Sequence, residues 1–567
     1  MNPRRYLAVV GDADAPLPPH LTGEALAATG LEINVAAPWL RIWHDPRMPV
    51  TVNADLAVLG HVAWDREAPE GPLQALADLL PAWGDWLAIG RDPDNCVWIQ
   101  RSPLGHLPAY VMNIGNRVLI SSDAELLLKA AGCTPAIDWS FVTTHLAFAH
   151  LQTAQTGLEG VTELMHGSLL HPATTETQEL TWSPWAYTSS DREISTFDEA
   201  VSCLRGAIDR AVRGTLGSHR QPLLELSGGV DSSVLAASLA RGTCGASAAT
   251  LVTDRREGDE RRYASAAAMA SGMPLLEIPV PGAPDLDRPI GRRLARPGLP
   301  LLLSPADRSL ADLARHEDFD AFVSGAGGDC VFASPISAAP AADVLIRFGL
   351  GRRAVKAIDD LARIHEASGW EVARMAWQQS RRGPLHPVWQ RRTAFLKNAH
   401  DIPLPVHPWL DEPDGVLPGK RSQIRSILAA LAHVDGYGRH EVAPSIYPFL
   451  SRPVVETALR IPSWLWIEGG IDRAVARRAF SGFLPTLVLE RRTKGGLDGY
   501  GIAGIEAHRA SLRIFLLEGH LARQGIVDRG EIDDVLARPI SRTDRCYHGL
   551  FPLIDTEAWV RAWLGDP

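Results

Sequence analysis

Apolar runs broken by turn residues dominate the first part of the chain. They lie at residues 7–10, 55–59, 86–90, 96–100, 109–112 and 117–121. Short runs of this kind, bounded by Gly, Pro, Asn and Asp, predict strands of an antiparallel or mixed sheet. Residues 125–131 and 135–150 have helical spacing instead, and the Trp-, Pro- and Ser-rich stretch at 181–190 predicts a linker.

The pattern changes after residue 196. A helical stretch at 197–216 is followed by strands and helices predicted at 221–226, 234–240, 248–253, 260–271, 275–280 and 320–324. Repeated strand–loop–helix units predict a parallel α/β sheet. Residues 335–440 are Arg-rich and are predicted to be mostly helical. We therefore expect two domains, formed by residues 1–185 and 196–567.

Composition narrows the class of protein and its partners. The 567 residues are 46% apolar and 22% charged, which is typical of a globular chain, and the formal net charge is −10. This acidic balance argues against nucleic acid as the main partner, although 473–478 and 491–494 could form a local basic patch. No apolar stretch approaches the roughly 18 residues of a membrane span. The six cysteines include no CxxC pair, so we expect a cytoplasmic protein with reduced thiols and no membrane contact.

The most informative segment is Leu-Ser-Gly-Gly-Val-Asp-Ser-Ser at residues 226–233, between a predicted strand and a predicted helix. Backbone N–H groups at a helix N-terminus bind anions such as phosphate. Two glycines allow close approach of the phosphate oxygens, and the serine hydroxyls add donors. Asp231 can hold the Mg²⁺ that accompanies a polyphosphate. The segment therefore predicts a phosphate-binding loop.

This segment resembles the pyrophosphate-binding loop of the N-type ATP pyrophosphatases and differs from a Walker A loop. The resemblance implies that ATP is cleaved to AMP and pyrophosphate, usually through an acyl-adenylate. Pyrophosphate would then be held by Ser227, Gly228, Gly229, Ser232 and Ser233. The nearest Walker-like string, residues 415–420, has three residues between its glycines where four are needed, and we expect a surface turn there.

Two further strings resemble the asparagine synthetase family. Residues 324–332, Ser-Gly-Ala-Gly-Gly-Asp-Cys-Val-Phe, match its second glycine cluster, which implies that Asp329 is a second magnesium ligand beside Asp231. Residues 491–496 resemble its Arg-x-x-Lys segment, which implies that Lys494 neutralises charge building on the α-phosphate and the leaving pyrophosphate. The family pattern also implies largely backbone contacts to adenosine from Leu226, Val252, Ser324 and Gly325.

The N-terminal part carries the family resemblance as well. Residues 101–110, 121–125 and 158–167 look like strings of the family's glutaminase domain. The implied fold is α/β: a degenerate N-terminal-nucleophile glutaminase-like sandwich, then a PP-loop (adenine nucleotide alpha hydrolase-like) parallel synthetase domain with helical additions. A working glutaminase of this family exposes Cys as its first mature residue. Here Met1 precedes Asn2 and the first cysteine is Cys96, so we expect no glutamine hydrolysis.

Departures from the family pattern point to the reaction. Ala326 replaces a family glutamate, and no string matches the Tyr–Glu pair of the β-lactam synthetases. Residues 407–420, 447–456, 459–464 and 469–477 resemble the lasso peptide cyclases. That resemblance implies adenylation of an Asp or Glu side chain of a core peptide, followed by macrolactam formation with the peptide's N-terminal amine. Implied partners are a ribosomal precursor peptide, a leader peptidase and a leader-binding protein.

Two other functions stay open: another ATP-dependent amide synthetase acting on a small carboxylic acid, and a non-catalytic, peptide-binding pseudoenzyme. The sequence assigns no general base. His440, Glu441 and Glu456 lie near the right segment, but we expect surface or structural roles for them. Aromatic residues of the C-terminal region, Trp464, Trp466 and Tyr500, would offer a docking surface if they were exposed.

Overall fold

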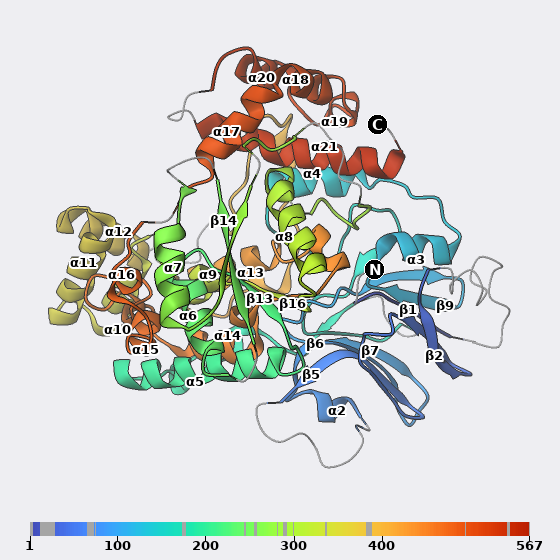
Figure 1. Cartoon of the computed structure of the whole chain (residues 1–567), viewed down its shortest axis with the longest axis horizontal. Helices are drawn as coiled ribbons and strands as arrows, with labels where there is room; N and C mark the ends of the chain where they lie inside the picture. Colours follow the sequence, from blue (N-terminus) through green and yellow to red (C-terminus); the bar gives the residue numbers. More distant parts are fainter. Residues whose placement is uncertain are drawn as a thin grey trace.

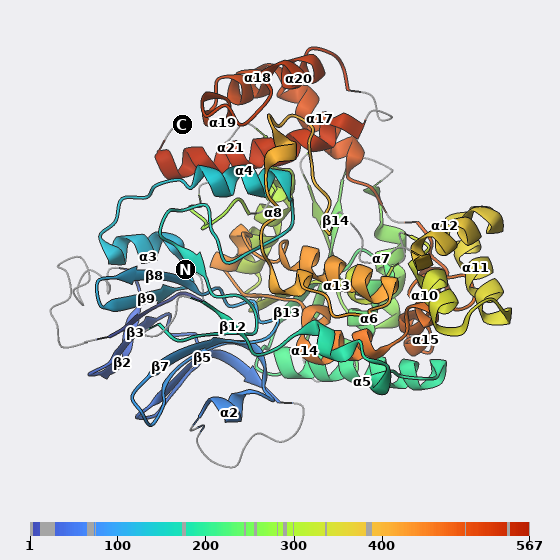
Figure 2. The same cartoon turned by 180° about the vertical axis from the view of Figure 1, so that it is seen from behind.

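A computed structural model gives the fold of most of the chain (Figures 1 and 2). It describes residues 4–11, 29–64, 73, 75–172, 177–242, 245–253, 258–280, 282–286, 292–298, 300–334, 337–381, 388–493, 495–540 and 545–565. Within them, no helix combines the length and the apolar character that crossing a membrane requires.

The N-terminal part contains two six-stranded antiparallel sheets. The first has the order β10-β8-β9-β1-β3-β2, with bounds Thr162–Glu163, Tyr110–Ile114, Arg117–Ser121, Tyr6–Val10, Leu40–His44 and Glu32–Ala37. The second has the order β12-β11-β7-β6-β5-β4, with bounds Glu179–Leu180, Ser168–Leu170, Val97–Arg101, Trp83–Arg91, Leu56–Ala63 and Val50–Val52.

A buried apolar cluster joins these two sheets. It includes Tyr6, Ile42 and Ile120 from the first sheet and Leu59 and Ile89 from the second, and all five side chains are fully buried. Such alternate inward positions of two facing sheets form the core of a sandwich. The predicted sandwich is confirmed, together with the predicted helices, which the structure places at α3 (Ala124–Ala131) and α4 (Trp139–Ala147).

A third sheet, in the second half of the chain, has five strands that are all parallel, in the order β15-β14-β13-β16-β17. Its strands are Leu275–Pro279, Ser247–Val252, Pro222–Glu225, Ala321–Val323 and Ser445–Ile446. The associated helices are α5 (Phe197–Leu216), α6 (Val230–Leu239), α7 (Arg261–Ala270) and α8 (Ser304–His316). Figure 1 shows α7 and α8 on opposite sides of the green strands, as the predicted α/β arrangement requires.

Helical additions surround this sheet. They comprise α10 (Ala339–Phe348), α11 (Arg352–His365), α12 (Gly369–Arg381), α13 (Pro418–Leu431), α14 (Arg452–Arg460) and α15 (Ala474–Ala479), with α16 (Thr486–Leu489) after them. A C-terminal group follows, α17 (Asp498–Ala507), α18 (Arg509–Leu517), α19 (His520–Arg523), α20 (Arg529–Leu536) and α21 (Leu550–Leu564). Figures 1 and 2 both place α21 beside α4 of the N-terminal part.

Two local predictions need correction. Only the start of residues 415–420, at Gly415, is an exposed turn, because Pro418 opens α13, and Gly419 and Lys420 are buried. Gly419 N–H donates to Asp343, and the Lys420 ammonium contacts the Ile461 carbonyl. The condition set for the aromatic docking surface is not met by two of its three residues: Trp466 is fully buried and Tyr500 is 4% exposed, whereas Trp464 is partly buried. Long-range packing covers both segments.

The predicted linker at 181–190 packs closely against the synthetase half. Trp182 and Trp185 are buried, and Trp182 Nε1 donates to Glu456 Oε1 at 2.8 Å. Glu456 also accepts from Arg452 Nε at 2.5 Å, so Glu456 is held in the structural role expected for it. The exact domain boundaries stay a prediction.

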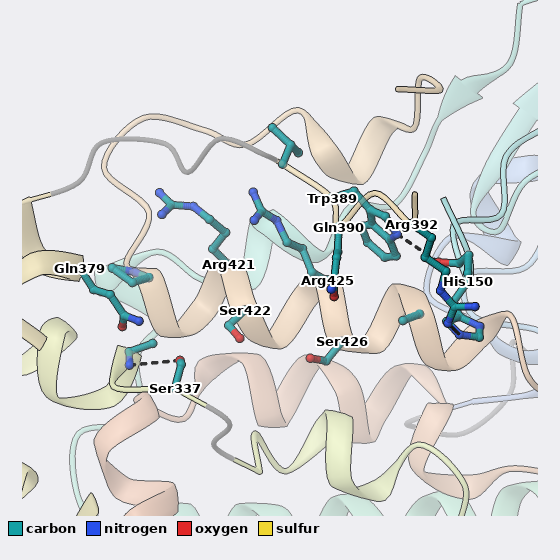
Figure 3. A pocket seen from close by; sticks show the side chains of 15 residues that line it. His150, Ser337, Gln379, Trp389, Gln390, Arg392, Arg421, Ser422, Arg425 and Ser426 are labelled. Atoms are coloured by element: carbon teal, nitrogen blue, oxygen red, sulfur yellow. Dashed lines mark hydrogen bonds between the residues drawn. The ribbon is translucent and has the colours of Figure 1, made fainter. Parts of the chain in front are cut away.

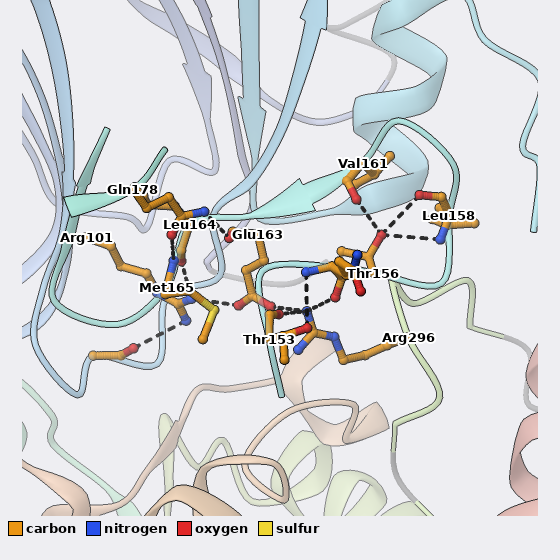
Figure 4. A network of polar contacts seen from close by, with 12 residues as sticks. Arg101, Thr153, Thr156, Leu158, Val161, Glu163, Leu164, Met165, Gln178 and Arg296 are labelled. Atoms are coloured by element: carbon orange, nitrogen blue, oxygen red, sulfur yellow. Dashed lines mark hydrogen bonds and ion pairs between the residues drawn. The ribbon is translucent and has the colours of Figure 1, made fainter. Parts of the chain in front are cut away.

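A buried ion-pair network joins the two halves (Figure 4). Glu163 of β10 lies 2.6 Å from Arg101 of β7 and 2.6 Å from Arg296, which belongs to the segment after β15. Arg101 also donates to the Leu164 carbonyl at 2.8 Å. All three charged side chains are nearly inaccessible, at 6%, 1% and 9% exposure respectively. One carboxylate thus forms ion pairs with two buried guanidinium groups, one from each half of the chain.

We predict that Glu163→Gln lowers the free energy of unfolding by about 3 kcal/mol, because two buried cations lose their shared counter-charge. Urea unfolding measures the loss. The matched control is Asp312→Asn, which removes an exposed carboxylate from its pair with Arg315 and leaves stability nearly unchanged. Equal losses in the two variants would contradict this account of the network.

Candidate active site

The carboxyl ends of β13, β14 and β16 open into a cavity of about 590 Å³. Ligands of open parallel sheets bind at this edge. Eight sequence-predicted residues line the cavity: Leu226, Ser227, Gly229, Asp231, Ser232, Ser324, Gly325 and Asp329. Three others, Gly228, Ser233 and Val252, directly adjoin lining residues in the chain. Lys494 lies outside the described residues.

The first loop connects β13 to α6. Gly229 is the residue before the helix, its N–H donates to Ser227 Oγ at 3.3 Å, and its carbonyl accepts from Ser232 Oγ at 3.3 Å. Gly228 has φ +65°, and a Cβ there would lie 2.3 Å from the Tyr263 carbonyl carbon of α7. Only glycine fits this position without displacing α7. The loop therefore places the N–H groups of the first turn of α6 at the cavity, where they can bind an anion.

The second glycine loop, after β16, packs directly on the first. A Cβ on Gly325 would lie 3.0 Å from the backbone nitrogen of Ser232. A Cβ on Gly328 would lie 2.8 Å from both Cβ and Cγ of Asp231. This close contact brings Asp329, the next residue along the chain, to the cavity that Asp231 also lines. The two carboxylates that the sequence pairs are thus brought to one site by two loops.

Arg473 is the main cation beside these carboxylates. Its Nε lies 3.5 Å from Asp231 Oδ1, and its guanidinium is mostly buried. Burial acts to lower the pKa of Arg473, but the carboxylates of Asp231, Asp472 and Asp329 raise it above the usual value. The sequence singled out residues 473–478 only as a local basic patch. In the structure Arg473 and Arg477 line the cavity, whereas Arg478 is exposed.

The segment around residue 494 is anchored to the phosphate loop. Arg491 Nη1 donates to the Ser227 carbonyl at 3.1 Å, and the same guanidinium pairs with Glu260. Glu260 also accepts from Gly495 N–H at 3.1 Å. Arg477 Nη2 donates to the Arg491 carbonyl at 3.0 Å. The residues flanking Lys494 are therefore fixed relative to Ser227. Sequence analysis missed Arg477, Arg491 and Glu260 as organising residues, because nothing in their spacing reveals these long-range contacts.

Other acidic groups at the cavity are paired. Glu225 lies 2.8 Å from Arg439, Asp472 lies 2.7 Å from Arg477, and Glu260 pairs with Arg491. The residues considered as bases, His440, Glu441 and Glu456, are not among those lining the cavity. His440 is partly buried, and loss of solvation holds its pKa well below the usual value, so the imidazole is neutral. The described residues thus offer this cavity no unpaired, dedicated strong base.

The oxygen ligands that the protein offers here suit magnesium only when a polyphosphate binds together with the ion. Within the described part of the chain, no cluster of three or more His, Cys, Asp or Glu side chains has a metal-binding arrangement. Asp231 and Asp329 would supply two oxygen ligands beside an anion-binding loop. Magnesium commonly takes one or two carboxylates and completes its octahedral shell with phosphate oxygens and water. The residues present fit that mode.

We predict that Gly328→Ala weakens binding of Mg·ATP about 10–100-fold, because the added Cβ displaces the Asp231 carboxylate. Isothermal calorimetry with Mg·ATP, and with ATP in EDTA, will show a loss confined to the magnesium complex. The matched control is Gly482→Ala, where a Cβ meets nothing within 4 Å. Parental affinity in Gly328→Ala would show that the contact does not position the carboxylate.

Comparison with known proteins agrees with this geometry. The family model described as asparagine synthase matches residues 203–561, which is more than half of the chain and includes both glycine loops. No curated protein matches the chain. Members of the matching family use ATP, typically with Mg²⁺, to form amide bonds. The chain therefore belongs to the asparagine synthase family of ATP-dependent amide synthetases.

Proposed function

We propose that this synthetase is a lasso-type peptide cyclase. It would adenylate an Asp or Glu side chain of a core peptide and join that carbonyl to the peptide's own N-terminal amine. The observation that carries the proposal is the composition of the cavity. A glycine loop and two carboxylates that would serve ATP line it, whereas the other acidic groups, Glu225, Glu260 and Asp472, are each held by an arginine.

In the first step, a carboxylate oxygen of the peptide bonds to the α-phosphorus of ATP. The bond from that phosphorus to the bridging oxygen breaks, and pyrophosphate leaves. Ser227, Gly229, Ser232 and the first turn of α6 would hold the departing phosphates, with Gly228 and Ser233 maintaining the loop. Leu226, Val252, Ser324 and Gly325 would contact adenosine. Asp231 and Asp329 would hold Mg²⁺, and Lys494 would neutralise charge that increases in the transition state.

In the second step, the peptide's amine attacks the activated carbonyl, AMP leaves, and the nitrogen loses a proton. An unperturbed α-amine has a pKa of about 7.7–8.0, so a sizeable fraction is neutral near physiological pH. Such a nucleophile needs little activation. This property suits a cavity in which Ala326 replaces the family glutamate and the remaining acids are paired.

The proposal also implies how the substrate arrives. The amine must be a free N-terminus, so a peptidase must first remove any leader from a ribosomal precursor, and a leader-binding protein would bring precursor and peptidase together. A small carboxylic acid joined to a separate amine is the competing reaction. It would use the same nucleotide site but would not require both reacting groups on one molecule.

The direct test uses the purified chain, Mg·ATP and the leader-free peptide encoded beside its gene. We expect a product lighter by one water, with one AMP and one pyrophosphate per product. A peptide acetylated at its N-terminus should give AMP turnover without the lactam. Formation of ADP and phosphate, or AMP formation that no carboxylate stimulates, would refute the proposal.

Asp329→Ala and Lys494→Ala should impair different steps, the first nucleotide binding and the second turnover. We predict that Asp329→Ala weakens Mg·ATP binding and suppresses adenylation, because a magnesium ligand is lost. Lys494→Ala should keep nucleotide affinity nearly unchanged and lower turnover about 10²–10³-fold, because the lost charge acts in the transition state. Calorimetry and product mass give the two readouts. Near-parental turnover in Lys494→Ala would show that this lysine is not the catalytic cation.

A further inference from the structure

A second cavity, of about 580 Å³, lies along helix α13 (Figure 3). Four polar residues of α13, Arg421, Ser422, Arg425 and Ser426, line it, and Figure 3 shows them along one helix. Their spacing of i, i+1, i+4 and i+5 places them on one face. Other positions of the same helix, including Ile424, Ile427, Leu428 and Leu431, are buried in the apolar core. The polar face is therefore directed at the cavity.

Arginine side chains dominate the charge of this cavity. Arg392 also lines the cavity, and its Nη2 lies 3.2 Å from His150 Nε2. Glu412 is the carboxylate that compensates Arg421, at 2.5 Å, and it lies 3.6 Å from Arg425. No ion pair to Arg392 occurs among the described residues. Among the described residues, two of the three guanidinium groups thus share one carboxylate, and the third, that of Arg392, pairs with none.

The neighbouring His150 and His433 do not change the positive charge of this cavity, because their lowered pKa values favour the neutral ring. Burial, with the nearby His433 and Arg392, lowers the pKa of His150 to about 3, so the ring beside Arg392 is neutral. Burial also lowers the pKa of Arg392 and, despite Glu412, that of Arg425. Guanidinium groups nevertheless stay protonated at neutral pH. Partly buried cations without matching counter-charge favour binding of an anion.

This cavity is close to the nucleotide site in the chain and in the fold. Ser334 lines the nucleotide cavity, and Ser337, three residues later, lines the second cavity. Gln423 of α13 donates to the Val331 carbonyl at 2.7 Å, and Val331 ends the short helix α9 (Gly328–Val331) that carries Asp329. A peptide reacting at the first cavity is therefore positioned to extend into the second.

We propose that the second cavity binds a carboxylate of the peptide substrate other than the one that is adenylated. This inference rests on the proposed peptide cyclase function. Guanidinium groups suit this task because they donate paired, charge-assisted hydrogen bonds to carboxylates. The ligand is either an acidic side chain in the peptide or its C-terminal carboxylate, since both present the same chemistry. Trp389, whose ring forms part of the wall, provides an apolar surface for the adjoining peptide.

Binding is tested by calorimetry with three acetylated pentapeptide probes. Two carry one carboxylate each: Gly-Gly-Glu-Gly-Gly amide, with a side-chain carboxylate, and pentaglycine with a free C-terminus. The third, Gly-Gly-Gln-Gly-Gly amide, is neutral. At least one acidic probe should bind at least tenfold more tightly than the neutral probe, and the pattern identifies the source of the carboxylate. Equal binding of all three probes would overturn the proposal.

Variants locate the binding to this cavity. The double substitution Arg392→Gln/Arg425→Gln should reduce acidic-probe affinity at least tenfold and leave one equivalent of Mg·ATP bound as in the parent. Arg392→Lys/Arg425→Lys, which keeps the charge, should recover part of the affinity. The matched control is Arg374→Gln, at an exposed position of α12 that is absent from both cavity linings. Loss of a second ATP equivalent in the double variant would instead identify a nucleotide site and contradict the inference.

Steady-state kinetics of cyclisation distinguish a failure of the carboxylate site from a failure of the proposed cyclase function. If cyclisation occurs, the double variant should raise the KM for the peptide at least tenfold while kcat changes less than threefold. An unchanged KM would overturn the carboxylate site and leave the cyclase function standing. If no peptide is cyclised but acidic probes still lose affinity in the double variant, the anion site stands and the cyclase function fails.

Discussion

The close contact of two glycine-bearing loops is the constraint on which the synthetase site depends. Gly328 lies so near Asp231 that a single added carbon would stand 2.8 Å from its Cβ and Cγ. Gly325 approaches the backbone of Ser232 in the same way. Each loop ends a different parallel strand, so this contact converts two separate sequence motifs into one site. The phosphate loop and both carboxylates depend on it for their relative positions.

Buried arginines hold segments of the structure together that are far apart in the sequence. Arg473 stands beside Asp231, Arg477 holds the Arg491 carbonyl, and Arg491 reaches the phosphate loop. Buried arginines also join the two halves of the chain, where Glu163 forms ion pairs with Arg101 and Arg296. These cations come from segments far apart in the sequence and act as internal cross-links. Three arginines of the predicted local basic patches, Arg473, Arg477 and Arg491, therefore organise the interior of the site.

Local patterns were sufficient to predict much of this molecule. The strand–loop–helix units around β13, β14 and β16 were predictable because each carries its own apolar periodicity and glycine signals. The two-residue strand β17 was missed, since Ser445–Ile446 is too short to show a period. The burial of Lys420 was also missed, because segments distant in sequence cover it. Eight predicted site residues line one cavity, whereas their roles and the position of Lys494 stay predictions.

The central claim is that a peptide carboxylate attacks the α-phosphorus of ATP, and isotope transfer tests it most directly. The peptide's acidic side chain is labelled with oxygen-18, and the products of a single turnover are analysed by mass spectrometry. One labelled oxygen should appear in AMP and none in pyrophosphate, with the other labelled oxygen retained in the lactam carbonyl. Label in inorganic phosphate, or unlabelled AMP beside a cyclised product, would contradict adenylation by this site.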